Sequence, residues 1–192
     1  MSREEIRITG KMVVLREKRL SDARNDYEWS CDPLLSRLDA ASPLNMSYTE
    51  FLDEYTLDID YSSSSRRRFA IETTDGEHIG NCSYYNIDYR RGEAEIGIMI
   101  GKPEYWGKGY GTDTLKTLIN YIFKNTSFKR IYLKTLEWNK RAQKCFIKTG
   151  FSPYDKIRRN GYTFLLMELP RSKWELQSEN QESYESNSRT TG

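Results

Sequence analysis

The chain has 192 residues, with 30 Lys and Arg against 28 Asp and Glu, and a formal net charge of +2. This length suits one well-buried domain, and the balanced charge argues against a whole-molecule field that would capture nucleic acid or a membrane surface. Any binding site should therefore depend on local features of the chain.

The sequence also bounds the compartment and the metal content of the protein. No apolar run is long enough to span a bilayer, and the first ten residues, MSREEIRITG, lack the apolar core of a secretory signal. The three cysteines, Cys31, Cys82 and Cys145, lack CxxC spacing, which argues against a disulfide framework or a zinc site. We expect a cytoplasmic protein with reduced thiols and no metal.

The first third of the chain predicts a strand followed by two helices. Residues 6–16 have a strand pattern, and Ser21 or Asp22 can cap a short helix that ends at Trp29. A capping box at Ser47 and Glu50 starts a second helix, which is followed by a polar loop at 62–65.

Turn signals then divide the chain into short strands. Asp75-Gly76 and Arg91-Gly92 separate strands at about 69–74, at 77–87 and up to residue 100. Asn160-Gly161 predicts a hairpin of 151–158 with 162–169. The single histidine, His78, lies beside the first turn, and we expect it to be solvated and without a role.

Three glycines at alternate positions, Gly107, Gly109 and Gly111, lie between a strand pattern and a helix pattern. The strand pattern alternates isoleucines up to Ile100, and the helix pattern places apolar residues at three- and four-residue spacing from Leu115 onward. Without β-carbons the backbone can take positive φ values, so its N–H groups can converge on phosphate oxygens at a helix N-terminus. The spacing predicts a phosphate cradle.

Spacing separates the known types of phosphate loop. A Walker loop needs Lys and then Ser or Thr after the last glycine, whereas Thr112 and Asp113 follow Gly111. A dinucleotide fingerprint needs a small residue where Thr112 stands and an acid about twenty residues later, and Glu137 comes too late. On the glycines alone, a turn without a ligand stays open.

A second motif, NKRAQKCFIKTGF at 139–151, follows a strand pattern at 131–136. Together, WGKGYG at 106–111 and N-x-x-A-x-x-x-F-x-K-x-G-F resemble the acetyl-CoA signature of the GNAT N-acetyltransferase superfamily. The tryptophan before the first glycine, Thr112 and the segment GKMVVLREKRLSDA at 10–23 are most similar to the Rim-type branch. The resemblance covers roughly residues 8–169.

The resemblance implies an α/β fold of the α+β kind, with a mixed central sheet of about seven strands, about four helices and splayed central strands that hold the cofactor. Residues 1–172 would form this single domain. After Trp174 the composition becomes Ser, Glu, Gln, Asn and Thr, which bury little apolar surface, so 173–192 are expected to be a disordered tail.

The resemblance also places the cofactor. Pantetheine would lie along Ile98, Met99 and Ile100, where Gly97 and Gly101 suggest a bulge, and an N–H near Met99 would stabilise the oxyanion. Asn139 resembles the residue that bonds pantetheine, and Arg141, Lys144 and Lys148 are candidates for the 3′-phosphate. The diphosphate would rest on the cradle, where Lys108 would compensate for Trp106 standing in place of the usual Gln or Arg; the cradle residues are Trp106, Gly107, Lys108, Gly109, Tyr110, Gly111 and Thr112.

Catalysis requires a neutral amine, so a carboxylate should accept a proton. Glu95 stands where Rim-type relatives often carry an acid and is the candidate base. Phe146 occupies the place of the tyrosine that protonates the CoA thiolate in many relatives, which leaves the acid unassigned. The acceptor would lie against residues 31–47, where Asp32 and Asp39 offer carboxylates, although Asp32-Pro33 also signals a turn.

These residues predict an enzyme that moves acetyl from acetyl-CoA directly to a primary amine in a ternary complex. The acceptor would be a protein N-terminus, a polyamine or another small amine, with no nucleic acid or membrane partner, and the protein would be a monomer or homodimer. A non-catalytic acyl-CoA-binding or sensing module is the rival that Phe146 keeps open. A nicotinamide-dependent reductase is a weaker third reading.

Overall fold

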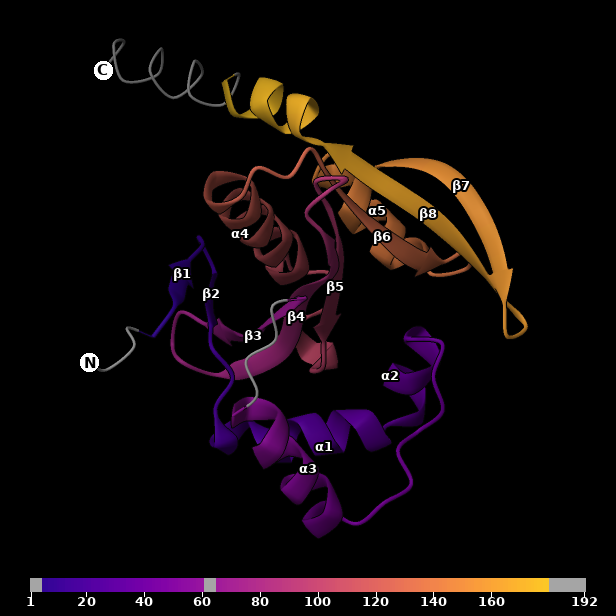
Figure 1. Cartoon of the computed structure of the whole chain (residues 1–192). Coiled ribbons are helices and arrows are strands. Elements are labelled where there is room, and N and C mark those ends of the chain that lie inside the picture. Colours follow the sequence, from indigo (N-terminus) through magenta and orange to yellow (C-terminus); the bar gives the residue numbers. More distant parts are fainter. Residues whose placement is uncertain (1–4, 61–64, 180–192) are drawn as a thin grey trace.

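An eight-stranded mixed sheet forms the centre of the structure, a computed structural model that describes residues 5–60 and 65–179 (Figure 1). The strand order is β1-β2-β3-β4-β5-β6-β8-β7, and every neighbouring pair is antiparallel except β5 with β6. The strands are β1 (Arg7–Thr9), β2 (Val13–Arg16), β3 (Arg66–Thr73), β4 (His78–Asp88), β5 (Glu93–Ile100), β6 (Arg130–Leu136), β7 (Ser152–Arg159) and β8 (Tyr162–Pro170).

Helices cover the sheet in two groups. In Figure 1, α1 to α3 gather at the bottom of the view, whereas α4 lies to the left of β5 and α5 to its right. The helices are η1 (Leu20–Asp22), α1 (Ala23–Cys31), α2 (Pro33–Leu38), α3 (Tyr48–Asp60), η2 (Pro103–Tyr105), α4 (Tyr110–Asn125), α5 (Lys140–Lys148) and a last helix at 171–179. None of the described helices is long and apolar enough to cross a membrane.

The main core lies between α4 and the sheet. The apolar stripe expected from the sequence of α4 is buried, and it packs on buried residues of β2, β5 and β6, as amphipathic helices do on a sheet. Each such side chain contributes roughly 1.5–3 kcal/mol of transfer free energy. This packing holds the glycine turn, which precedes α4, against the end of β5.

The sheet opens between β5 and β6. Their parallel pairing covers Glu93–Glu95 with Arg130–Tyr132 and then stops, so residues 96–100 of β5 have no pairing with β6. On the other side β5 stays paired with β4 through Gly80↔Ile100. The predicted fold with splayed central strands is confirmed.

Several predicted boundaries change. The strand at 6–16 is two strands separated by a turn at 10–12, and a β-carbon on Gly10 in this turn would collide with Thr117 and Asp113 of α4. The sheet therefore has eight strands in place of about seven. The expected bulge between Gly97 and Gly101 is absent from the regular pairing of β5 with β4, which shifts register instead between Tyr85 and Asp88.

Helices also depart from expectation in two places. The segment interpreted as a turn at Asp32-Pro33 starts α2, and Asp32 caps it by accepting hydrogen bonds from the N–H groups of Leu34 and Leu35. The expected disorder from residue 173 is wrong as far as 179, because 171–179 is helical and Trp174 packs on Phe123. Residues 180–192, and 62–64 of the expected polar loop, lie outside the described residues.

The capping box and the hairpins follow the sequence, but His78 does not. Ser47 and Glu50 exchange the expected hydrogen bonds at the start of α3. His78 is buried under Trp29 at a ring distance of 4.8 Å, and its Nε2 lies 2.9 Å from the carbonyl oxygen of Gly80. A solvated His78 was the wrong expectation, since the burial comes from α1, a distant element.

Candidate active site

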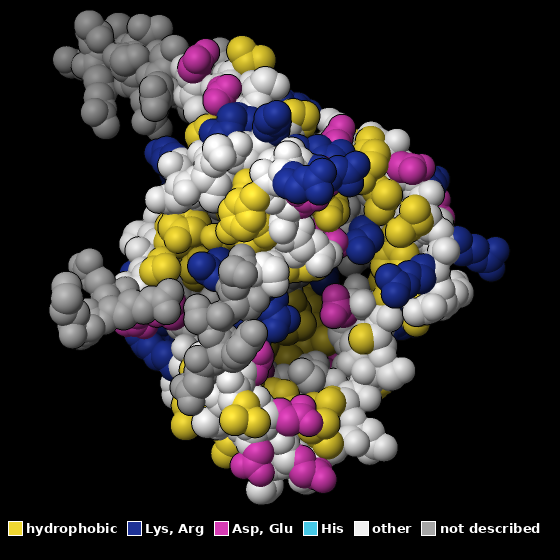
Figure 2. Space-filling model, in the orientation of Figure 1, with side chains coloured by type: hydrophobic (Ala, Val, Ile, Leu, Met, Phe, Trp, Pro, Cys, Tyr) yellow, Lys and Arg dark blue, Asp and Glu magenta, His cyan; other side chains and the backbone are white. Residues whose placement is uncertain are grey.

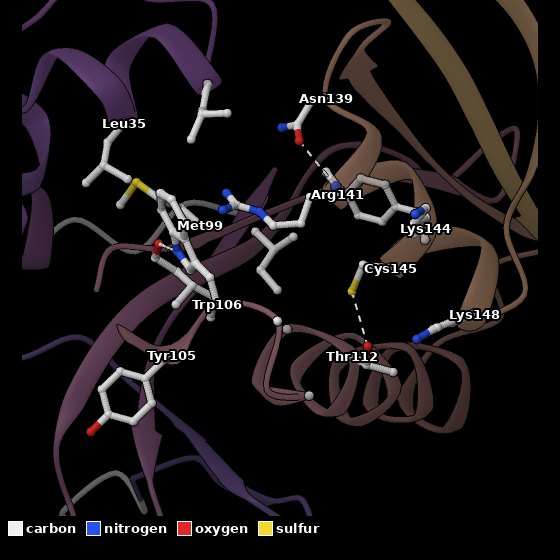
Figure 3. Close-up of a pocket in the computed structure, with 18 of the residues that line it drawn as sticks. Leu35, Met99, Tyr105, Trp106, Thr112, Asn139, Arg141, Lys144, Cys145 and Lys148 are labelled. Atoms are coloured by element: carbon white, nitrogen blue, oxygen red, sulfur yellow. Dashed lines mark hydrogen bonds between the residues drawn. The ribbon is translucent and has the colours of Figure 1, made fainter. Parts of the chain in front are cut away.

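A cavity of about 340 Å³ opens where β5 and β6 part (Figure 3). One wall comes from the end of β5 and the glycine turn, a second from the start of α5, and a third from α2. The lining residues are Leu35, Leu38, Asp39, Ile98, Met99, Ile100, Tyr105, Trp106, Gly107, Gly109, Gly111, Thr112, Asn139, Arg141, Ala142, Lys144, Cys145, Phe146 and Lys148.

The glycine turn faces this cavity without side chains. Gly107 and Gly109 have φ values of 73° and 99°, and Gly109 is the N-cap of α4. A β-carbon on Gly107 would meet nothing within 4 Å, and one on Gly109 would meet only the Met12 sulfur at 3.5 Å. The turn therefore presents backbone N–H groups and the positive end of a helix dipole to a hollow space, as an anion site requires.

The open edge of β5 supplies backbone groups of alternating direction. The N–H of Gly101 donates to Ile79 of β4 at 2.9 Å, so by the alternation of an antiparallel ladder Met99 also points its N–H toward β4. Ile98 and Ile100 then direct their backbone groups to the cavity side. The open backbone donors of this strand thus belong to the neighbours of Met99, while the Met99 side chain lines the cavity.

Two side chains brace the wall formed by α5. Asn139 caps α5, because its Oδ1 accepts a hydrogen bond from Ala142 N–H at 3.2 Å, and this leaves its amide nitrogen for another partner. Thr112 Oγ1 lies 3.4 Å from Cys145 Sγ and ties the first turn of α4 to α5 (Figure 3). Burial raises the pKa of Cys145, so the thiol is a poor nucleophile.

Cations gather at the cradle end of the cavity. Arg141, Lys144 and Lys148 all come from α5 and line the space beside the glycine turn. No carboxylate pairs with any of them within residues 5–60 and 65–179. The predicted cofactor residues therefore meet in one place, except that Lys108 and Tyr110 are not among the lining residues.

The opposite end of the cavity is apolar with one carboxylate. Leu35 and Leu38 of α2 and Met99 of β5 line it together with Asp39, the C-cap residue of α2. Asp39 is exposed by surface area, and its carboxylate has no hydrogen bond or ion pair in the described part of the chain; the atoms packed around it still desolvate the carboxylate and raise its pKa. Sequence reasoning named Asp39 without distinguishing it from Asp32; only the fold separates the cap from the cavity residue.

Glu95 lies beside the cavity and is not among its lining residues. Its carboxylate is 2% exposed and accepts hydrogen bonds from Tyr85 O–H at 3.1 Å and Asn86 Nδ2 at 2.9 Å, with Lys134 Nζ at 3.2 Å. The backbone of Asn86 has a φ of 50° and lies at the register shift in β4, and its side chain reaches Glu95 from there. Burial, then the charges of Glu95 and Asp39, raise the pKa of Tyr85, which therefore keeps its proton at neutral pH.

Phe146 is buried and packs edge-on against Phe151 at a ring distance of 6.1 Å. The phenyl ring of Phe146 on the cavity wall has no acidic proton to donate. Tyr105 at the rim has a hydroxyl proton, but it directs this hydroxyl away from the cavity to Glu77 (Figure 3).

Comparison with known proteins gives a consistent result. A family model described as "Acetyltransferase (GNAT) domain" matches residues 13–152. The chain is 26% identical over 147 residues to an uncharacterized N-acetyltransferase p20 of Bacillus licheniformis, covering 76% of this chain and 82% of that protein. It is 34% identical over 106 residues to the spermidine N(1)-acetyltransferase of Escherichia coli K12, covering 55% of each chain.

Among solved structures, the chain resembles the spermidine N-acetyltransferase of Vibrio cholerae in complex with CoA and spermine. The TM-score is 0.75 at 23% identity, and the match covers 85% of this chain and 98% of that one. At this identity the likeness supports the fold.

Proposed function

The chain belongs to the GNAT family of acetyl-CoA-dependent N-acetyltransferases, and we propose that its acceptor is a primary amine of a small aliphatic polyamine. The observation that carries this proposal is the polarity of the cavity. Unpaired cations line the cradle end, and an unpaired carboxylate among apolar side chains lines the other end. A polyanionic cofactor and a cationic acceptor would therefore enter from opposite sides.

The residues of the cradle fit acetyl-CoA. Side chains at Gly107 and Gly109 would project into free space, which a diphosphate can occupy. The cavity-side backbone groups of Ile98 and Ile100 suit pantetheine amides, and one of their N–H groups would polarise the acetyl carbonyl, in place of the donor expected at Met99. When bound, acetyl-CoA supplies the activated acetyl thioester.

Direct transfer in a ternary complex agrees with the cavity lining. Cys145 is the only cysteine among the lining residues, and it is a bonded thiol with a raised pKa on the diphosphate side. Serving as a covalent acetyl carrier requires an exposed, activated nucleophile. We therefore expect sequential kinetics, with both substrates bound before the thiol is released.

Charge around the acceptor end favours a polyamine. Residues 22–60 contain ten Asp and Glu against two Arg, and although Asp22, Asp26 and Asp58 pair with bases outside this segment, the rest still leave an acidic surface. Figure 2 shows acidic side chains gathered over the lower helices, next to a hollow in the surface. A field of one sign raises the local concentration of a polycation. A peptide N-terminus carries one cation and would gain less.

Asp39 and Glu95 are both candidates for receiving the amine proton. Asp39 contacts the cavity, and a raised pKa makes a carboxylate a better proton acceptor near neutral pH. Glu95, the acid that the sequence favours, would act through the Tyr85 hydroxyl that it holds. We propose that Asp39 takes the proton and that Glu95 positions Tyr85.

A thiol-release assay over a panel of amines tests this function. With acetyl-CoA, we expect spermidine and spermine to release free thiol at a lower KM than a tripeptide N-terminus does. Asp39→Asn should lower kcat/KM for spermidine by about 10-fold or more, because both the proton acceptor and a charge-assisted hydrogen bond are lost, and Asp32→Asn is its matched control. Binding of acetyl-CoA without thiol release for any amine would favour the non-catalytic module.

A further inference from the structure

The glycine turn brings no cationic side chain to the cavity, because Lys108 is not among the lining residues, and the fold brings a cation there from another element. Arg141 extends from α5 across the cavity, and its guanidinium carbon lies 3.5 Å from the centre of the Trp106 ring (Figure 3). The two residues are 35 positions apart in sequence and come from opposite walls. Both line the cavity.

Trp106 is a fixed platform for this stack. Its indole N–H donates a hydrogen bond to the carbonyl oxygen of Ile100 at 2.8 Å, which anchors the ring to the end of β5. A guanidinium on an indole face gains roughly 0.5–2 kcal/mol, more where water is excluded. The stack therefore determines where the Arg141 charge lies when the site is empty of ligand.

Arg141 has donors to spare. No carboxylate pairs with it within residues 5–60 and 65–179, and burial lowers the pKa of Arg141. A stacked guanidinium keeps its N–H groups in the ring plane, free to donate to an oxyanion beside the stack. Trp106 directly precedes the glycines of the cradle, and these glycines line the same cavity as Arg141.

We propose that Arg141, held on Trp106, is a ligand of the cofactor diphosphate and supplies from α5 the cation that the glycine turn lacks. The diphosphate would lie between the cradle N–H groups and the guanidinium. Lys148, further along α5, would then serve the 3′-phosphate. This inference rests on the proposed use of acetyl-CoA, and it changes the sequence-based expectation that Arg141 meets the 3′-phosphate.

Binding of CoA and of dephospho-CoA, which lacks only the 3′-phosphate, separates the two phosphate positions. Calorimetric titration of Arg141→Gln should show both affinities lowered by about the same factor, roughly 10- to 100-fold, as expected for a lost hydrogen bond to a charged group. The matched control Lys148→Gln removes the same charge from the same helix. It should weaken CoA and leave dephospho-CoA within about twofold.

Variants of the platform test the role of Trp106. Trp106→Phe keeps an aromatic face and should hold affinity within a few-fold, whereas Trp106→Leu should weaken both ligands. In an Arg141→Gln background, Trp106→Leu should cost clearly less than it does in the wild type, because the two residues act through one contact. Melting temperatures of all variants identify any that fail to fold.

Three results would overturn the inference. In the first, Arg141→Gln binds CoA and dephospho-CoA as tightly as the wild type. In the second, it binds both more tightly, because the stack of Arg141 on Trp106 only blocks the cavity. In the third, it loses affinity for CoA but not for dephospho-CoA. Amine-dependent thiol release by the wild type in the same experiments would show that only this inference had failed. Absence of any CoA binding by the wild type would instead count against the proposed function.

Discussion

Gly109 illustrates how much of the site rests on a missing side chain. Its φ of 99° strains any L-residue, and a β-carbon there would project into the space beside the cradle. Gly161, with φ of 79°, sits in the tip between β7 and β8 and has open space around it. The two glycines therefore share a backbone conformation but not a surrounding.

Replacing each glycine by alanine separates strain from binding. Gly109→Ala and Gly161→Ala should both lower the unfolding free energy by roughly 1–2 kcal/mol, the cost of a left-handed residue with a β-carbon. Only Gly109→Ala should also weaken acetyl-CoA binding, by about 10-fold or more, since the methyl group displaces a phosphate oxygen. Equal binding losses in the two variants, measured by titration, would contradict a diphosphate on this turn.

At the residue scale, the sequence predicts contacts that arise within one short segment. The glycine turn is local, and spacing alone locates it, whereas the resemblance assigns Asn139 to pantetheine and only the structure shows that it caps α5. The stack of Arg141 on Trp106 and the cavity position of Asp39 join separate elements, so no motif contains them. Asp32 and Asp39 look equivalent in the sequence because capping and cavity lining both suit an aspartate at a helix end.

The helix at 171–179 is an element that composition conceals. Arg171 donates hydrogen bonds to the carbonyl oxygens of Phe123, Thr126 and Phe128 at 2.6–2.9 Å and so closes the end of α4. The Trp174 indole donates to Asn120 Oδ1 at 2.7 Å and packs on Phe123. One arginine and one tryptophan fix a segment whose other residues are mostly polar.

Trp174→Ala should therefore lower the unfolding free energy by roughly 2–3 kcal/mol, somewhat below the range for a fully buried aromatic side chain because Trp174 is only half-buried. Leu176→Ala is the control on the same helix, because Leu176 is 62% exposed and its truncation should change stability by less than about 0.5 kcal/mol. Denaturant titration measures both. A loss of unfolding free energy for Trp174→Ala as small as that for Leu176→Ala would mean that the packing of Trp174 does not stabilise the fold.

At the element scale, periodicity predicts α4 because its apolar residues bury one continuous face, and turn dipeptides predict the hairpins. It misses α2, whose six residues are too short to show a period and whose Asp32-Pro33 start is also a turn signal. It also joins β1 and β2, whose connecting turn donates hydrogen bonds from Met12 and Val13 N–H to Asp113 of α4, a contact distant in sequence. Short elements and breaks thus depend on packing that the sequence pattern does not contain.

For the whole molecule, a buried polar network links the lower helices to the sheet. Arg16 bridges Asp22 at 2.7 Å and Glu72 at 2.5 Å, and Lys18 pairs with Asp26 of α1. His78 lies 3.5 Å from Asp22. Networks of this kind are stable only while each member keeps its charge state.

The network predicts loss of stability in acid. Burial, with the charge of Lys18 adding to it, lowers the pKa of His78, so the unfolded chain takes up this proton before the folded protein does. Stability is then complete above the unfolded value of about 6.5 and falls as the pH drops below it. Burial alone would raise the pKa of Asp22, but hydrogen bonds from Arg16 and Arg19 outweigh burial and lower it. The stability that the Asp22 carboxylate contributes is therefore lost as the pH falls below about 4.

His78→Gln keeps an amide donor for the Gly80 carbonyl but cannot titrate. Its melting temperature should change less between pH 7 and 5 than that of the wild type, which should lose up to roughly 1.4 kcal/mol per unit of pKa shift. Scanning calorimetry at half-unit pH steps gives both curves. Parallel curves would assign the acid sensitivity to groups other than His78.

The gap between β5 and β6 has a consequence for the catalytic cycle. The β5–β6 pairing ends after Glu95, so residues 96–100 of β5 present an open edge, and we expect the pantetheine arm to take the place of a strand there. After acetyl transfer, CoA would stay bound through hydrogen bonds to β5 that do not involve the reacting thioester. Dissociation of CoA would break these hydrogen bonds, as removal of a strand from a sheet does. We therefore expect product release, and not acetyl transfer, to limit the rate of turnover.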